Sequence, residues 1–518
     1  MARSKYPLSA KMIGSILQAD RVYRVARETP LEYAPQLSGK TGNDVWLKRE
    51  DQQPIFSFKV RGAYNKLSSL PPNSTVVAAS AGNHAQGVAY GARELGHRAV
   101  IFMPETTPDI KTEAVRNLGA EVRLIGNTFV DAQAYALKAV KRYGYILVHP
   151  FDDPMVIAGQ GTVGREILRQ SNPPPDAIFV PVGGGGLAAG IAAYCKQVHP
   201  QIRIYAVESV ESACLAHAFQ HNSRRRLSRI GVFADGVAVD RIGKHTFPLL
   251  RECVEPGVIQ VKVDEMCAAV QDGYQETRTM FEPSGALAIA GLQKYVAQTG
   301  RTGERLAAIV SGANVSFDRL QYITERANLG AGTEILLAVR LPDRPGAFLS
   351  FCRRLGRCYI TEFNYRISSR DEAWVFCGVN ITGAEREALQ GRLRRHYDVH
   401  DITGSSLAVD HARYLIGGRP GVGLIENSRE HVMQLEFPEL PGAVQKFLQC
   451  LRELDKRYNI TMFHYRNHGS AFAQVLLGLS APHTNAAEIA KLLSDAGYPC
   501  KVQNQEVAYR FFLQPHID

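Results

Sequence analysis

The segment Ile178-Phe179-Val180-Pro181-Val182-Gly183-Gly184-Gly185-Gly186-Leu187 runs from a β-rich apolar stretch directly into four consecutive glycines. A helical pattern follows, from Leu187 to Val198. A strand that ends in glycines and opens into a helix exposes backbone N–H groups at the positive end of the helix dipole, which favours phosphate binding. The segment therefore predicts a strand, loop and helix unit with an anion site at its turn.

The flanking sequence repeats this alternation. Helical patterns such as His84 to Leu95 separate further β-rich runs, which we predict as strands at Val76 to Ala79, Ala99 to Met103, Ile146 to His149 and Ala307 to Val310. Strands that alternate with helices indicate an α/β fold with parallel sheets, in which ligands bind at the carboxyl ends of the strands. Motifs that directly follow a strand are therefore the first candidates for a site.

Two further motifs occupy such positions. Ser80-Ala81-Gly82-Asn83-His84 follows the first of these strands, and Ser311-Gly312-Ala313-Asn314 follows the last. Their small and amide-bearing side chains leave backbone N–H groups accessible to a ligand. We expect both motifs to lie near the glycine loop.

The composition is that of a folded protein. The chain has 518 residues, of which 45% are hydrophobic and 21% charged, and its length predicts about three domains. The formal charge of +10, from 60 basic and 50 acidic residues, is scattered, with Arg224 to Arg226 as its only tight basic run. This distribution argues against nucleic-acid binding, which usually shows basic clusters interleaved with aromatic residues.

Cysteine usage and hydropathy exclude other classes. The nine cysteines form no Cys-x-x-Cys pair, so neither a zinc site nor a disulfide framework is expected. Residues 1–17 contain no apolar core of a signal peptide, and the chain has no apolar stretch of 18 or more residues. We expect a cytoplasmic protein that does not enter a membrane.

Lys59 is the candidate reactive residue. It lies in Ser57-Phe58-Lys59-Val60-Arg61-Gly62-Ala63, between apolar neighbours and small residues that allow a flat ligand to approach. A desolvated amine loses its proton more easily, and only the neutral amine attacks an aldehyde to form a Schiff base. The alternative is an ordinary surface lysine, which this segment alone favours.

The glycine loop has an alternative interpretation of its own. Gly184, Gly186 and Ala189 also fit the Gly-x-Gly-x-x-Ala pattern of dinucleotide sites, and Glu208 ends a predicted strand about 20 residues later. A nicotinamide cofactor would leave the Lys59, Ser80 and Ser311 segments without a role. One phosphate-bearing cofactor accounts for all of them.

The last third of the chain contains an internal duplication. Leu341-Pro342-Asp343-Arg344-Pro345-Gly346-Ala347 matches residues 437–443, and Ile360 to Arg366 matches residues 460–466. Each copy predicts a small α+β module of about 75 residues. We expect a catalytic domain at 1–320, a linker at 321–333, modules at 334–407 and 431–505, and a connector at 408–430.

Together these motifs resemble the biosynthetic threonine dehydratases (threonine deaminases), within the tryptophan synthase β-like, fold type II pyridoxal phosphate enzymes. The resemblance covers nearly the whole chain, and the tail is similar to the ACT-like regulatory modules of that family. It implies that pyridoxal 5'-phosphate is held as a Schiff base on Lys59. The remaining roles that it implies are Gly183, Gly184, Gly185, Gly186 and Leu187 for the cofactor phosphate, Asn83 for the ring hydroxyl, Ser311 for the pyridine nitrogen, and Ser80, Ala81, Gly82, Asn83 and His84 for the substrate carboxylate.

The resemblance also implies the reaction. Ser311 cannot keep the pyridine nitrogen protonated as a carboxylate would, which suits β-elimination better than reactions through a long-lived carbanion. Serine racemases of the same group carry a serine where this chain has Ala81, so we expect dehydration rather than racemisation. The expected activity is a lyase that converts L-threonine, and also L-serine, to a keto acid and ammonia as the first step of isoleucine biosynthesis. A serine dehydratase or a β-replacement synthase is the alternative.

Regulation and assembly are implied in the same way. Isoleucine would inhibit the enzyme and valine would oppose it, with Glu362, Tyr365, His464 and Tyr465 as candidate ligands. The alternative is that the two tyrosines are core residues preserved by the duplication. Relatives suggest a homotetramer. No metal is predicted, because a carboxylate such as Glu208 at a strand end is usually a hydrogen-bonded cap.

Overall fold

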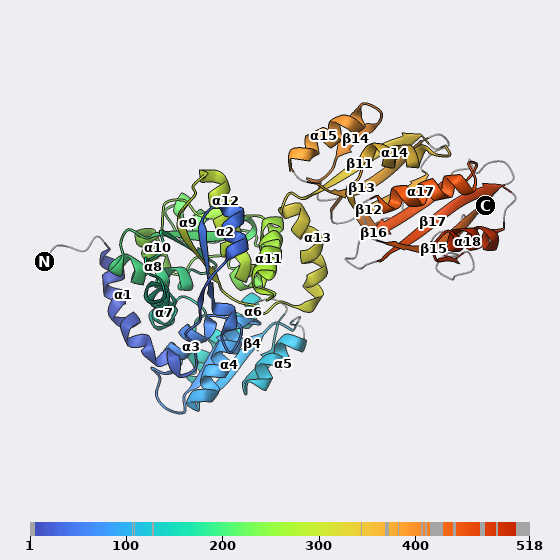
Figure 1. The fold of residues 1–518 in the computed structure, drawn as a ribbon. Helices are drawn as coiled ribbons and strands as arrows, with labels where there is room; N and C mark the ends of the chain where they lie inside the picture. Colours follow the sequence, from blue (N-terminus) through green and yellow to red (C-terminus); the bar gives the residue numbers. More distant parts are fainter. Residues whose placement is uncertain are drawn as a thin grey trace. The chain divides into compact units, whose positions relative to one another are not determined.

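The computed structural model divides the chain into two compact units, residues 1–330 and residues 331–518 (Figure 1). It describes residues 6–105, 107, 109–126, 129–342, 344–367, 372–381, 383–405, 408–409, 412–414, 428–438, 442–466, 472–482 and 485–503. The two units are described separately.

A six-stranded sheet forms the centre of the first unit. Its strand order is β1-β2-β10-β7-β8-β9, and all neighbours are parallel except β1 and β2. The strands are β1 (Leu31–Tyr33), β2 (Asp44–Arg49), β7 (Ala177–Pro181), β8 (Arg203–Ser209), β9 (Ile259–Val261) and β10 (Arg305–Val310). The predicted runs at 178–182 and 307–310 therefore form the central strands of this sheet.

Helices cover both faces of this sheet, because its central strands are apolar on both sides. In β7, Ile178 and Val180 pack into one core and Ala177 and Phe179 into the other. The first core includes residues of α7 (Pro154–Gln170), α8 (Gly186–Val198) and α10 (Thr246–Cys253), and the second those of α11 (Val263–Thr277) and α12 (Pro283–Thr299). This is the predicted α/β architecture.

A second, four-stranded parallel sheet has the order β5-β4-β3-β6. It contains β3 (Thr75–Ala79), β4 (Arg98–Met103), β5 (Glu121–Leu124) and β6 (Ile146–Leu147), with α3 (Lys59–Leu67), α4 (Asn83–Leu95), α5 (Asp109–Asn117) and α6 (Phe129–Tyr143) around it. The predicted strand from Ile146 to His149 is too long by two residues. The chain turns away there, and the His149 ring accepts the N–H of Asp152 at 2.8 Å.

The expected linker at 321–333 is mostly helical. Residues Leu320–Gly330 form α13, and its side chains Ile323 and Ala327 are buried in the same core as α11 and α12. The first unit consequently extends to Gly330 rather than ending at residue 320. An amphipathic face with two apolar residues four positions apart explains the packing.

The second unit is one eight-stranded sheet, in the order β14-β11-β13-β12-β16-β17-β15-β18. The strands are β11 (Glu334–Pro342), β12 (Tyr359–Ile367), β13 (Glu372–Asn380), β14 (Asp398–Asp401), β15 (Ser428–Pro438), β16 (Asn459–Arg466), β17 (Phe472–Pro482) and β18 (Cys500–Val502). The two copies of the duplication join where β12 pairs antiparallel with β16. The predicted modules are therefore halves of one sheet.

Four helices lie on one face of this sheet (Figure 1). They are α14 (Ala347–Leu355), α15 (Gly383–Arg394), α17 (Ala443–Leu454) and α18 (Ala486–Asp495). Each copy thus has the predicted order of strand, turn, helix, two strands and helix. Gly346 and Gly442, the glycines of the two Pro-Gly turns, have φ values of 82° and 81°, which explains why glycine is needed there.

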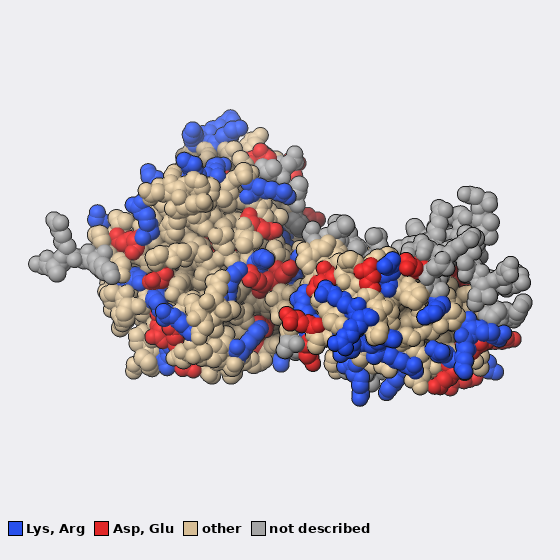
Figure 2. Space-filling view, turned by 90° about the horizontal axis from the view of Figure 1, so that it is seen from above, with Lys and Arg blue, Asp and Glu red and all other residues tan. Residues whose placement is uncertain are grey.

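The surface carries charges of both signs. On the faces shown in Figure 2, Lys and Arg side chains form separate groups on the first unit and lie closer together on the second. All nine cysteines are unpaired in the structure. Within the described part of the chain, no helix combines the length and the apolar character needed to cross a bilayer.

Candidate functional site

Four predicted site segments meet at the carboxyl edge of the large sheet. Lys59 is the first residue of α3, Asn83 the first of α4 and Gly186 the first of α8, while Ser311 directly follows β10. Residues Ser57 and Gly312 form an isolated antiparallel bridge, which joins the Lys59 segment to the end of β10. The N-termini of three helices therefore face a common region, as expected for a site that binds anionic groups.

Lys59 has the surroundings of a reactive amine. Its Nζ donates a hydrogen bond to the carbonyl oxygen of Pro150 at 2.9 Å and lies 5.2 Å from the centre of the Phe58 ring. Burial lowers the pKa of Lys59 to about 8, and Glu282 opposes this effect only in part. A substantial fraction of the amine is thus neutral near physiological pH.

The glycine loop is closely packed against neighbouring residues of the first unit. A Cβ on Gly184 would come within 2.2 Å of the Phe151 ring, and one on Gly183 within 2.9 Å of Val237. Gly185 has a φ of 90°, which side chains rarely tolerate. Thr246 fixes the loop by donating a hydrogen bond to the Gly184 carbonyl at 2.8 Å. The loop therefore offers backbone rather than side chains to a ligand, next to the N-terminus of α8.

Asn83 belongs to a hydrogen-bonded chain of polar side chains. Its Nδ2 donates to Glu282 Oε1 at 2.7 Å, and its Oδ1 accepts from Asn314 Nδ2 at 2.8 Å. Glu282 is only 3% exposed, and burial raises its pKa to about 7. The sequence analysis did not identify Glu282, because 199 residues separate it from Asn83.

Ser311 and its neighbours lie beside this chain. Ser311 is 3% exposed, and its hydroxyl donates to the backbone carbonyl of Ser284 at 3.2 Å. Ser284, also missed in the sequence, has a buried hydroxyl oxygen for which the structure shows no partner. Both hydroxyls are neutral, so the residue that follows β10 brings no negative charge to this side of the site.

His84 behaves differently from the rest of its loop. Its side chain is buried, and its Nε2 lies 2.8 Å from the carbonyl oxygen of Val148. Burial lowers its pKa to about 3, so the ring stays neutral. Ser80, Ala81 and Gly82 remain half-buried before the N-terminus of α4. Any contact of His84 with a substrate would therefore come from its backbone.

Glu208 has the geometry of a helix cap. It is fully buried, and its two carboxylate oxygens accept the N–H groups of Leu215 at 2.8 Å and Ala216 at 2.9 Å. Both donors belong to α9 (Cys214–Gln220). Among the described residues, no group of three or more His, Cys, Asp or Glu side chains could hold a metal ion.

In the second unit, the structure separates the four candidate effector ligands. Tyr365 and Tyr465 pack in the core beneath the helices. Side chains alternate along a strand, so Glu362 and His464 lie on the opposite face of the sheet. There, Glu362 forms a buried ion pair with Arg413 at 3.0 Å. The four residues therefore do not form one site.

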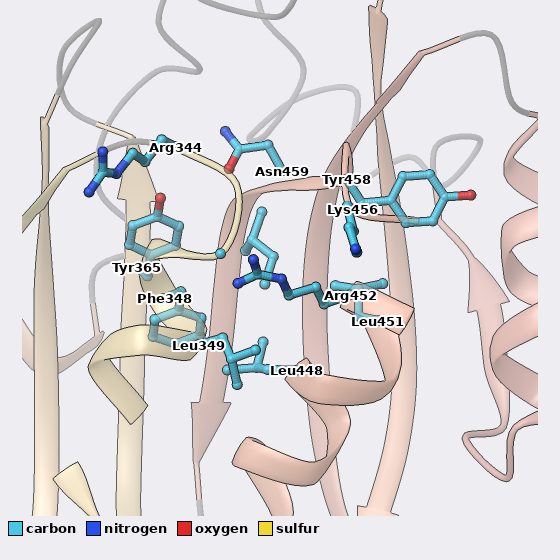
Figure 3. A pocket seen from close by; sticks show the side chains of 12 residues that line it. Arg344, Phe348, Leu349, Tyr365, Leu448, Leu451, Arg452, Lys456, Tyr458 and Asn459 are labelled. Carbon is cyan, nitrogen blue, oxygen red and sulfur yellow. The ribbon is translucent and has the colours of Figure 1, made fainter. Parts of the chain in front are cut away.

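Tyr365 lines a pocket between the two halves of the sheet (Figure 3). Apolar side chains form part of the wall, and Arg452 extends from α17 toward Tyr365. The lining residues are Arg344, Gly346, Phe348, Leu349, Tyr365, Leu448, Leu451, Arg452, Lys456, Tyr458, Asn459 and Ile460. Among these residues, only Tyr365 was predicted from the sequence as a candidate ligand.

The residues at the sheet edge fit the cofactor that the resemblance implies. A loop of glycines that offers backbone N–H groups at the N-terminus of α8 suits a phosphate group, and a partly neutral lysine suits an aldehyde. Asn83 and Ser311 can each form hydrogen bonds to polar atoms of a planar ring. No residue of the set conflicts with such a ligand.

Comparison with known proteins agrees with this arrangement. Residues 22–312 match the family model of pyridoxal-phosphate dependent enzymes, and residues 325–412 and 421–513 match the C-terminal regulatory domain of threonine dehydratase. The chain is 45% identical over 504 residues to L-threonine dehydratase biosynthetic IlvA of Burkholderia multivorans, covering 95% of this chain and 97% of that protein. It is 46% identical over 483 residues to the chloroplastic biosynthetic threonine dehydratase of Arabidopsis thaliana, covering 92% and 80%.

Solved structures of related enzymes are similar to part of the chain. The processed form of threonine deaminase isoform 2 from Solanum lycopersicum has a TM-score of 0.60 and 45% identity, covering 62% of this chain and 88% of that one. A serine racemase from Dictyostelium discoideum has a TM-score of 0.55 and 30% identity, covering 59% and 99%.

Proposed function

Because the chain belongs to the biosynthetic threonine dehydratases, pyridoxal-phosphate dependent enzymes with a C-terminal regulatory domain, we propose that it converts L-threonine to 2-oxobutyrate and ammonia. The observation that carries the proposal is the Lys59 amine, which donates to Pro150 next to Phe151, the residue against which the glycine loop packs. L-Serine is a second proposed substrate, since it differs from threonine by one methyl group. Residues up to Gly330 carry catalysis in this proposal, and the rest carry regulation.

Each site residue has a role in the proposal. Pyridoxal phosphate, when bound, accepts the electrons that remain after an α-proton is removed. Lys59 holds the cofactor and, as a free amine with a pKa of about 8, can take a proton at Nζ. The N–H groups of Gly183 to Leu187 bind the phosphate, and those of Ser80 to His84 bind the substrate carboxylate.

Two hydrogen-bonding side chains complete the site. Asn83 orients the cofactor ring through its amide, and Ser311 faces the ring nitrogen with a neutral hydroxyl. A neutral hydroxyl would not keep the ring nitrogen protonated as a carboxylate would, so the ring would accept electrons less strongly, which favours prompt loss of the β-hydroxyl. The proposed reaction is therefore elimination.

The proposal is tested by an absorption spectrum of the purified protein before and after threonine, together with assay of the keto acid. A visible cofactor band and release of 2-oxobutyrate are expected. A band without keto acid from threonine or serine would overturn the proposed activity. Consumption of a second nucleophile such as sulfide, with a new amino acid as product, would favour a β-replacement synthase instead.

We also propose that the pocket beside Tyr365 binds an amino-acid effector, with isoleucine as the inhibitor and valine as its opponent. Arg344, Arg452 and Lys456 offer positive charge to a carboxylate, while Leu448 and Leu451 suit a branched aliphatic side chain. Tyr465 occupies the matching position in the second copy. Glu362 and His464, on the opposite face, would influence binding only indirectly.

The matched pair Arg452→Gln and Arg457→Gln tests this pocket. Arg457 is exposed and pairs with Asp455 outside the pocket. Loss of a charge-assisted hydrogen bond predicts isoleucine affinity about 10-fold to 100-fold weaker for Arg452→Gln, measured calorimetrically, and unchanged for the control. Equal affinities in both variants would contradict the pocket. By the same resemblance we propose that the protein is cytoplasmic and forms a homotetramer. Sedimentation of the purified protein tests the oligomeric state.

A further inference from the structure

A buried carboxylate at the site has no role in the reaction described so far. Glu282 immediately precedes α12, and its backbone N–H donates to the carbonyl oxygen of Gly312 at 3.2 Å. Its side chain therefore lies where α12 begins and β10 ends, beside the cofactor residues. A buried charge that contributes nothing would be costly, so its contacts need an explanation.

The contacts of Glu282 fix the orientation of the Asn83 amide. A carboxamide has two N–H donors and one oxygen acceptor. Glu282 accepts one N–H of Asn83, while Asn314 donates to the Asn83 oxygen and directs its other N–H to the Ile55 carbonyl at 2.8 Å. The carboxylate and Asn314 thus specify which end of the Asn83 amide is nitrogen. One Asn83 N–H is left for a ligand.

The packing around Glu282 is adapted to its carboxylate. A Cβ on Gly312 would lie 2.6 Å from Glu282 Oε1, so a side chain there would displace the carboxylate. Gly312 therefore makes room for Glu282 against Asn83.

The charges around Glu282 act in opposite directions. Lys111 and the N–H groups of Asn83 and Asn314 favour its ionised form, whereas burial and Asp235 oppose ionisation. Lys59 is close enough for the Glu282 charge to raise its pKa. Glu282 is thus coupled electrostatically to the amine that the proposed function places at the centre of the reaction.

We propose that Glu282 is a positioning residue, which holds the Asn83 amide so that its remaining N–H points at the ring oxygen of the cofactor. This inference rests on the proposed function for the identity of the cofactor. It requires that Glu282 and Asn83 act as one unit. Removal of Glu282 then allows the amide to rotate, and the hydrogen bond to the ring oxygen is lost for most of the time.

A double-mutant cycle tests the inference. Cofactor-free Glu282→Ala, Asn83→Ala and the double variant are titrated with pyridoxal phosphate, and the dissociation constant and visible band are recorded. Each single variant should bind the cofactor about 10-fold more weakly and shift the band, and the double variant should be no worse than Asn83→Ala. Independent effects that multiply in the double variant would overturn the proposal. So would a Glu282→Ala protein with wild-type affinity and spectrum.

Two further variants serve as controls for the test. Glu282→Gln keeps the size and an acceptor oxygen, so it should show a smaller loss of cofactor affinity than Glu282→Ala, and it replaces that variant if the latter does not fold. Glu265→Gln removes a carboxylate that pairs with Lys294 away from the site and should bind the cofactor normally. Failure of the proposed function is distinguishable, because the wild type would then bind pyridoxal phosphate without turning over threonine.

Discussion

Two lysines of the first unit, the buried Lys48 and the half-buried Lys59, are eleven residues apart and have opposite surroundings. Lys48 Nζ lies 2.6 Å from a carboxylate oxygen of Glu166 and also donates to the Thr29 carbonyl and to Gln170. Lys59 Nζ instead donates its hydrogen bond to a backbone carbonyl, that of Pro150. Burial lowers the pKa of both. Glu166 and Glu50 oppose this effect at Lys48, whereas at Lys59 only Glu282 opposes it and the pKa falls to about 8.

The Lys48 region is a balanced charge cluster. Arg61, Lys48, Glu50 and Glu166 have fully buried side chains, and two positive charges face two negative ones. Arg61 sits on α3, two residues after Lys59, and bonds to both carboxylates. The ion pairs of Arg61 thus hold α3 in place. Its first residue, Lys59, has no such ion pair among the described residues. The comparison shows that a reactive lysine is recognised by how weakly carboxylates offset its desolvation, not by its burial.

The largest effect is expected from Lys59→Ala. Loss of the amine should lower threonine turnover by at least about 1,000-fold, because both cofactor attachment and proton transfer depend on it. The free energy of unfolding of the cofactor-free protein should fall little or even rise, since a poorly compensated buried amine is removed. Turnover and urea denaturation measure the two quantities. A variant that kept a tenth of the activity would contradict the assignment of Lys59.

Glu166→Ala should have the next largest effect, on stability. It leaves Lys48 and Arg61 with Glu50 as their remaining partner in the cluster, and breaking a buried ion pair costs about 3 to 5 kcal/mol. Glu265→Ala, at a more exposed pair, should cost no more than about 1 kcal/mol. Urea denaturation of both variants is the measurement. Equal stabilities would show that the cluster is not balanced in the way described.

The pH dependence of stability tests the lowered pKa of Lys59. In the cofactor-free protein, Lys59 has a folded pKa of about 8 against about 10.5 when unfolded, so only the unfolded chain holds the proton between these values. Stability relative to Lys59→Met should therefore rise by up to about 3 kcal/mol as the pH increases from 8 to 10.5. A flat difference across this window would show that the Lys59 amine is not depressed.

Tyr23→Phe should have the smallest effect. Its hydroxyl donates to Glu166 at 2.7 Å, so the change removes one hydrogen bond from the charge cluster without altering its charge. The loss of one hydrogen bond to a charged group predicts destabilisation by about 1.5 kcal/mol, with threonine turnover within about twofold of wild type. A large loss of turnover in a stably folded variant would mean that the cluster does more than fix α3.

The sequence predicted the parts of the molecule that depend on local pattern. Apolar runs and glycines identified the strands and the loop after β7, and the duplication predicted the order of elements in the tail. Contacts between distant segments were not accessible, which is why Glu282 and the partnership of Lys48 with Glu166 were missed. One separation could have been expected from the sequence. Because side chains alternate along a strand, Glu362 and Tyr365, three residues apart, lie on opposite faces.

The attachment of the cofactor is the central claim. Reduction of the purified holoenzyme with borohydride makes such a link permanent, and peptide mapping by mass spectrometry then locates the modified lysine. The account predicts a single modified residue, Lys59, with Lys48 unmodified. A modification on another lysine, or on none in a protein that carries the cofactor, would contradict it.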